Sequence, residues 1–290
     1  MLKVVPLRYG TVFKKAFSDH EVFSAFASDV LGQTIRVETV QQEYRYPEAV
    51  GAVDIEYDLF GEDVEHRVIV ELQHVREPDF FDRFLHYHAV GIIEQATSHA
   101  VYRPARTVFT IVVLTTEPRD ATVRFSVAVS DPCPVTEQGK RLGVYRHRLV
   151  FLNPKVINAE TPPAARRWME LIADSLDGEV EEARYADPLM QRILGRIRDR
   201  TLTPAELALV KDEAAWDEVQ RDARLDGRLE GMLEGALREA RAMLFALAQA
   251  SGLALDAEAK ARIEGCQDVD VLRRWTLRVP RATWAGDVFD

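Results

Sequence analysis

Two short stretches in which apolar and polar residues alternate predict a β-hairpin early in the chain. In Ala52–Leu59 the odd positions are apolar and several even positions are acidic, among them Asp54. This period of two is typical of a strand with one buried face. Arg67–His74 alternates less cleanly, and residues 61–64 supply the loop between the two stretches. We therefore expect two antiparallel strands here.

The position of the turn predicts which side chains face each other. With the turn centred between Glu62 and Asp63, the numbers of paired residues sum to 125, which places Asp54 opposite Glu71. Opposed residues lie on the same face of an antiparallel pair, with Cβ atoms about 4.5–5.5 Å apart. Gln73 shares that face because side chains repeat every two residues. The spacing predicts either two carboxylates and an amide gathered at one site or an ordinary solvated acidic face.

Two carboxylates at that distance repel each other, so either the pKa of each is raised or the pair holds a cation. Mg²⁺ suits such a pair, since it is usually bound by one or two carboxylates together with waters and substrate phosphate. A bound ion of this kind polarises a phosphodiester and helps to form hydroxide from water. Gln73 cannot act as a general base, but its amide can orient the attacking water. The chemistry that this set of residues predicts is metal-dependent phosphodiester hydrolysis.

A helix is predicted after the hairpin, over Asp79–Tyr102, where apolar residues recur at helical spacing without an intervening proline. Arg83 and Tyr87 are four residues apart and share a face of this helix. Arg83 carries the forked donors that bind phosphate. Pairing of Arg83 with Asp79 or Asp82, and burial of Tyr87 as packing, are equally open.

Three histidines nearby suggest a zinc site, but their spacing argues against it. His86 and His88 are two residues apart on the predicted helix, so they point in different directions and do not gather with His74. Exposed or hydrogen-bonded histidines are the better interpretation.

The remaining pattern predicts a central sheet flanked by helices, followed by a helical region. Thr107–Thr115 is an almost continuous apolar run, as in a strand buried on both faces. We expect a mixed α/β core in residues 1–155 and a helical region in residues 156–290. Further elements are predicted as a helix near Val12–Val30, strands at Thr122–Val129 and Val144–Leu152, and a helix that starts with a capping box at Thr203 and Glu206.

Three glycines at four-residue spacing, Gly227, Gly231 and Gly235, lie on one face of a helix predicted around residues 220–250. Glycine destabilises a helix by up to ~1 kcal/mol per position, so close approach of another helix is an expected benefit. Self-association through this face, giving a homo-oligomer, and docking on the same chain are both open. Charges throughout the segment exclude a membrane helix pair.

Composition limits the function classes. The chain has 290 residues, 47% of them hydrophobic, and neither a signal-like N-terminus nor an apolar run of membrane-spanning length, so a cytoplasmic protein is expected. Cys133 and Cys266 form no zinc or disulfide pattern. A net charge of −10 argues against a protein that coats DNA, but a nuclease remains open, with phosphate contacts from a local basic patch.

With these residues identified, the first half of the chain resembles the PD-(D/E)XK nuclease superfamily, and more closely the Rpn-like recombination-promoting nucleases, a transposase-like family. The order and spacing of four blocks carry the resemblance: TVFKKAFSD (Thr11–Asp19), VDIEYDL (Val53–Leu59), VIVELQH (Val68–His74) and FFDRFLHYHAVGI (Phe80–Ile92).

The resemblance implies a restriction-endonuclease-like core and a Mg²⁺-dependent DNA endonuclease linked to recombination or mobile DNA, with Mn²⁺ as a substitute ion. It implies that Asp54, Glu71 and the backbone carbonyl of Leu72 bind the metal. Gln73 stands in the place of the usual lysine and would position water. Arg83 and Tyr87 would contact the phosphate of DNA.

One departure concerns Gly10, which stands where family members often carry an acidic residue, so a supporting carboxylate is either missing or supplied by Asp19 or Glu21. The alternative functions are a catalytically degenerate nuclease fold that binds DNA or a protein, and a structural oligomer.

Overall fold

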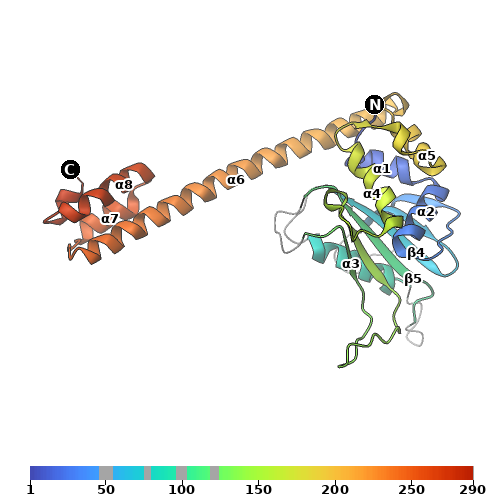
Figure 1. The fold of residues 1–290 in the computed structure, drawn as a ribbon, viewed down its shortest axis with the longest axis horizontal. Helices are drawn as coiled ribbons and strands as arrows, with labels where there is room; N and C mark the ends of the chain where they lie inside the picture. The colour runs from blue at the N-terminus through green and yellow to red at the C-terminus, as the bar shows by residue number, and fades with distance from the viewer. Residues whose placement is uncertain (46–54, 75–79, 96–102, 118–123, 290) are drawn as a thin grey trace. The chain divides into compact units, whose positions relative to one another are not determined.

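The computed structural model describes residues 1–45, 55–74, 80–95, 103–117 and 124–289 (Figure 1). These residues fall into two units, Met1–Ala214 and Ala215–Asp290. Several helices from the part of the chain that we predicted to be a separate helical region therefore belong to the first unit.

A six-stranded mixed sheet forms the centre of the first unit, with strand order β2-β3-β4-β5-β7-β6. The β4–β5 and β5–β7 pairs are parallel and the others are antiparallel. The predicted mixed α/β class is confirmed, and β5 is buried along all but its first residue, as expected of a central strand. The strands are β2 (Val40–Arg45), β3 (Glu56–Glu62), β4 (His66–Gln73), β5 (Thr107–Leu114), β6 (Val127–Ser130) and β7 (Arg148–Leu152).

Helices cover both faces of the sheet (Figure 1). On one face, the ring of Phe26 packs edge to face with those of Phe17 and Trp168 within the larger core cluster. On the other face, α3 packs through Phe84 and Tyr87. The helices of this unit are α1 (Gly10–Phe17), α2 (His20–Leu31), α3 (Phe80–Ile93), α4 (Pro163–Ser175) and α5 (Pro188–Ile197), and a two-stranded sheet joins β1 (Leu2–Lys3) to β8 (Glu179–Val180).

The single helix predicted near Val12–Val30 is two helices. Asp19 ends the continuity because its carboxylate accepts the backbone N–H groups of Glu21 and Val22 at the start of α2. Such a side-chain cap fixes a helix N-terminus.

The hairpin of β3 and β4 forms as predicted, but the predicted register is wrong. Observed pairs run from Leu59–Val70 to Glu62–Arg67, so the residue numbers sum to 129. The turn lies two residues later than expected. Asp63 sets it there, because its Oδ1 accepts the backbone N–H groups of Glu65 at 2.8 Å and His66 at 2.7 Å.

Gly61, which we predicted to lie in the turn, is a strand residue instead. A Cβ at this position would lie 3.0 Å from the ring of Phe23 and 3.2 Å from Val37. Glycine within a strand often marks such a close approach. Its lack of a side chain serves the packing of α2 against β3 rather than a chain reversal.

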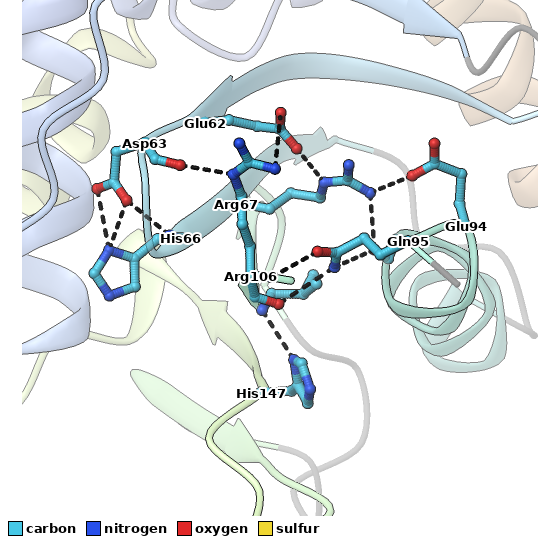
Figure 2. Close-up of polar contacts among 10 residues, drawn as sticks. Glu62, Asp63, His66, Arg67, Glu94, Gln95, Arg106 and His147 are labelled. Carbon is cyan, nitrogen blue, oxygen red and sulfur yellow. Dashed lines mark hydrogen bonds and ion pairs between the residues drawn. The ribbon is translucent and has the colours of Figure 1, made fainter. Parts of the chain in front are cut away.

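Buried and half-buried polar side chains hold the turn end of the hairpin (Figure 2). Arg67 is 6% exposed, and its guanidinium lies 2.5 Å from both Glu62 and Glu94 and donates to the carbonyl of Gly91 at 3.0 Å. Arg106 donates to the carbonyl of Asp63 at 2.7 Å. Since a buried arginine requires these acceptors, the network ties the hairpin to α3 and to the start of β5.

The second unit is helical, as predicted. Its core includes Leu244, Ile263, Leu272 and Trp275, from α6 (Pro204–Ala250), α7 (Ala257–Gly265) and α8 (Val269–Arg278). In the described ranges, none of the helices has the length and hydropathy to span a membrane.

The first turn of α6 lies in the first unit and carries the predicted capping box. Thr203 Oγ1 accepts the N–H of Glu206 at 3.2 Å, and Glu206 Oε2 accepts the N–H of Thr203 at 2.6 Å.

Candidate functional site

The β3–β4 ladder is interrupted where the observed register places Asp58 opposite Glu71. The Asp58 N–H donates to Oε1 of Glu71 at 3.3 Å, and the Leu72 N–H donates to Oδ2 of Asp58 at 2.9 Å. In a regular ladder the backbone carbonyls of the facing strand would accept such N–H groups. The regular pairs end at Leu59–Val70, so two carboxylates occupy the place where the strands cease to pair.

Asp54, which we predicted to face Glu71, lies outside the described residues. Asp58 has the position that the prediction gave to Asp54, because moving the turn by two residues changes the paired sum by four. Both acids belong to the same alternating segment, so the sequence contained the signal for Asp58. Only the turn position selects between them.

The backbone is irregular on both sides of Asp58. Tyr57 packs in the cluster under α3 and Leu59 in the cluster on the opposite face, although residues two apart in a regular strand share a face. Glu43, which faces Asp58 across the β2–β3 ladder, has a φ of 54°. This left-handed conformation is uncommon for a residue with a side chain, and such strain gathers at functional sites.

Burial makes both carboxylates hard to ionise. Glu71 is 3% exposed, and its burial, together with the nearby charge of Asp58, raises its pKa well above the usual range. Burial also raises the pKa of Asp58, against the opposing effects of the Leu72 N–H and of the Lys14 and Arg83 charges. A cation bound between the two carboxylates would favour their charged forms.

Arg83 and Tyr87, predicted as phosphate contacts, lie together on α3. The guanidinium of Arg83 donates to the Tyr87 hydroxyl, at 3.1 Å from Nη2 and 3.3 Å from Nε. The charge of Arg83 lowers the pKa values of both Asp58 and Glu71. Tyr87 is 7% exposed, so it both packs in the core and holds the guanidinium.

Leu72 and Gln73 follow Glu71 along β4. The carbonyl of Gln73 accepts the N–H of Thr115, on the β5 side. The Leu72 N–H points the other way, toward Asp58. Because the N–H and C=O of one strand residue point to the same side, the Leu72 carbonyl also faces the gap between β3 and β4, which is the orientation expected of the predicted metal ligand.

Lys14 of α1 also lies beside the carboxylate pair, and sequence reasoning missed it. Its Nζ lies 2.6 Å from Oε1 of Glu43, and its charge lowers the pKa of Asp58 and of Glu71. The sequence shows Lys14 only as one basic residue of the first block, without a partner.

Glu213, from α6, occupies the place that we expected Asp19 or Glu21 to supply near Gly10. It accepts the N–H of Gly10 at 2.6 Å and both the N–H and the hydroxyl of Thr11, at 3.0 and 2.7 Å. The expected substitutes are engaged elsewhere, because Asp19 and Glu21 both bind Arg192. Of the two expected alternatives, a missing carboxylate or one from Asp19 or Glu21, the contacts of Asp19 and Glu21 with Arg192 speak against the second. The contact of Glu213 with Gly10 spans about 200 residues and leaves no local signal in the sequence.

The histidines are hydrogen-bonded or exposed, as predicted. Nδ1 of buried His88 lies 2.9 Å from the Thr110 hydroxyl, and Nδ1 of His74 lies 2.8 Å from that of Thr115; His86 is exposed. In the part of the chain that is described, no three His, Cys, Asp or Glu side chains gather as a metal site. Carboxylate oxygens, such as those of Asp58 and Glu71, are the ligand type that a hard ion such as Mg²⁺ prefers.

Comparison with known proteins adds no evidence on this site. No family model matches the chain, and no curated protein or solved structure matches it either. The site consists of a carboxylate pair in an interrupted ladder, with Lys14 of α1 and Arg83 of α3 close enough to act on both charges.

Proposed function

We propose that this protein is a metal-dependent endonuclease that hydrolyses phosphodiester bonds in DNA, built on a PD-(D/E)XK, restriction-endonuclease-like core. The observation that carries the proposal is the meeting of Asp58 and Glu71 between two strands. Backbone pairing would stabilise the sheet there without bringing two repelling charges together. Titratable groups with pKa values raised by burial and by each other are typical of functional sites.

The residues of the candidate site have two roles in the proposed hydrolysis, binding of the metal ion and orientation of the attacking water. Asp58 and Glu71, with the Leu72 carbonyl, would hold Mg²⁺ or Mn²⁺. When bound, such an ion polarises the phosphodiester and lowers the pKa of a bound water. Gln73 orients the attacking water through its amide, since an amide cannot take the proton. Asp54 remains the acid that the family resemblance implies for the same site.

Arg83 supplies the contact to the substrate. Its guanidinium can donate two parallel hydrogen bonds to a phosphate, and Tyr87 restricts its orientation. The substrate class, DNA, and the link to recombination or mobile DNA rest on the resemblance of the sequence blocks.

A second function is favoured by one observation. Each carboxylate already accepts a backbone N–H, which is a structural use for the pair without any ion. With Gln73 in the place of lysine, a degenerate nuclease fold that binds DNA or a protein accounts for the same geometry.

The test is cleavage of supercoiled plasmid by the full chain with Mg²⁺ or Mn²⁺. We expect Asp58→Asn and Glu71→Gln to lower the rate about 100-fold or more, as loss of a metal ligand does. Glu56→Gln is the matched control, because Glu56 lies two residues before Asp58 on β3 and pairs with Arg45. Its rate should stay within about two-fold of wild type, as for a surface ion pair.

The other outcomes are informative too. Equal cleavage by all these proteins would mean a contaminating nuclease and would reject the site. Asp54→Asn and Glu71→Gln could lose activity while Asp58→Asn keeps it. That result would assign metal binding to Asp54 instead of Asp58. DNA binding that survives in every variant, without cleavage by any, would establish the degenerate fold.

A further inference from the structure

We propose that Lys14 is a positioning residue of the candidate site: from α1 it holds a fixed positive charge beside Asp58, a charge that Gln73 does not carry. The inference deepens the proposed function and rests on it. Lys14 lies in the first of the four resembling blocks, but the predicted set of site residues does not include it.

The ammonium group of Lys14 is held by Glu43, a residue with an uncommon backbone conformation. Lys14 bonds to Glu43 at 2.6 Å, and Glu43 is the residue that faces Asp58 across the β2–β3 ladder. The lysine side chain is 15% exposed, whereas that of Glu43 is 60% exposed. The left-handed backbone of Glu43 is a strain that a merely exposed ion pair does not require. The charge of Asp58 raises the pKa of Lys14 and that of Lys14 lowers the pKa of Asp58, as expected of two side chains that lie near each other.

The N-terminus of α1 is capped by a residue of another helix, α6. The side chain of Tyr9, the N-cap residue, makes no capping hydrogen bond, and Glu213 of α6 accepts the donors of Gly10 and Thr11 instead. Lys14 lies three residues after Thr11, on the same face of the helix. Glu213 thus holds the turn of α1 from which Lys14 extends.

The ammonium remains charged. Burial alone would lower the pKa of Lys14, but its hydrogen bond to Glu43 and the charges of Asp58, Glu43 and Glu213 raise it. These acids face it from β2, β3 and α6. Lys14 is therefore no general base, and its contribution is electrostatic.

A fixed positive charge beside two carboxylates has two opposite effects on the reaction. It repels a divalent cation from the pair, and it favours negative charge that develops on phosphate oxygens. Lys14 and Glu43 also line a cavity of about 280 Å³ bounded by α1, α5, β2 and α6.

Lys14→Met and Lys15→Met form a matched pair for the test. Both lysines lie on α1 and bind a single carboxylate, Lys15 pairing with Glu206 at 2.8 Å. For the full chain without DNA we would measure Mn²⁺ affinity by calorimetry, and with plasmid the Mg²⁺-dependent cleavage rate. Thermal melts would establish that each variant is folded.

We expect Lys14→Met to bind Mn²⁺ about three- to ten-fold more tightly, because a repelling charge is gone, and to cleave at least about ten-fold more slowly. Lys15→Met should change neither quantity by more than about two-fold. Lys14→Arg keeps the charge and should restore the wild-type affinity. A residue with only a structural role would not tighten metal binding when it is removed.

Unchanged affinity and rate in Lys14→Met, with wild-type protein that binds Mn²⁺ through Glu71, would overturn the role of Lys14 and leave the proposed function standing. Weaker Mn²⁺ binding in Lys14→Met would also overturn it. A wild type that binds no Mn²⁺ would overturn the inference together with the proposed function.

Discussion

Asp58 and Glu71 face each other across the β3–β4 hairpin, and each carboxylate accepts a backbone N–H, Glu71 from Asp58 at 3.3 Å and Asp58 from Leu72 at 2.9 Å. These bonds give both acids a partner before any cation arrives. A bound metal ion and the backbone N–H groups would therefore compete for the oxygens of the same two carboxylates. Because burial raises the pKa of Glu71 in the folded protein, the stability of the protein depends on the protonation of this carboxyl group.

Glu71→Gln should stabilise the metal-free protein at high pH. The pKa of Glu71 is higher in the folded state than in the unfolded chain, so the unfolded chain loses this proton first and stability falls as pH rises between the two values. Glutamine keeps the acceptor for the Asp58 N–H and carries no charge. At pH 8 we expect the variant to have a higher free energy of unfolding than the wild type.

The measurement is denaturant unfolding at pH 8 and near pH 4, where the gain should shrink. Saturating Mg²⁺ at pH 8 should reverse the order, because only the wild type gains stability from binding. A variant that is less stable than wild type at pH 8 without metal would contradict the prediction.

Gly61→Ala should destabilise the first unit. The added Cβ would lie 3.0 Å from Phe23 and 3.2 Å from Val37, and overpacking of a core costs about 1–3 kcal/mol. Phe23→Leu should recover part of this loss in the double variant, since contacting residues are coupled.

Gly195→Ala serves as the control for Gly61→Ala. Gly195 lies within α5, and a Cβ there meets nothing within 4 Å. Alanine should therefore stabilise this helix by up to about 1 kcal/mol. The measurement is the free energy of unfolding of the wild type, Gly61→Ala and Gly195→Ala. Equal changes in the two variants would refute the close approach at Gly61.

His88 should make the protein acid-sensitive. Burial, aided by the charge of His147, lowers the pKa of His88 to about 4. As pH falls below the ordinary value of 6.5, the unfolded chain takes up a proton that the folded protein does not, so stability is lost down to about pH 4. The full loss is about 3 kcal/mol.

The variant for this test is His88→Gln, in which the pH dependence of unfolding between 6.5 and 4 should be shallower. His86→Gln is the control, because His86 is exposed on the same helix. Identical pH profiles for wild type and His88→Gln would exclude His88 as the source.

The glycine face of α6 should mediate self-association. A Cβ at Gly227, Gly231 or Gly235 would meet nothing within 4 Å among the described residues, so this face has room for another helix. We expect Gly231→Leu to lower the mass measured by light scattering, because a large side chain blocks the approach of a second helix. Gly231→Ala should then weaken association, whereas on an unpaired helix it would only add up to about 1 kcal/mol of stability. An unchanged mass in Gly231→Leu would reject the role of this face.

Local patterns in the sequence determined which elements form. The alternation around Asp58 and Glu71 predicted β3 and β4, the apolar run predicted β5, and the reciprocal cap of Thr203 and Glu206 marked the start of α6. Each of these signals lies within a few residues, because side-chain period and capping depend on the immediate backbone. The pair of Arg83 and Tyr87 was predictable for the same reason.

Tertiary structure decided which charges meet. The turn that Asp63 caps lies two residues later than expected and brings Asp58, not Asp54, opposite Glu71, and Gly61 becomes a strand residue packed against Phe23 and Val37. Lys14 reaches this place on a helix whose N-terminus Glu213 caps from the far end of the first unit. Long-range ion pairs depend on packing between distant segments, so neighbouring residues in the sequence do not encode them, whereas hairpin register follows the turn, which the alternating pattern alone does not locate.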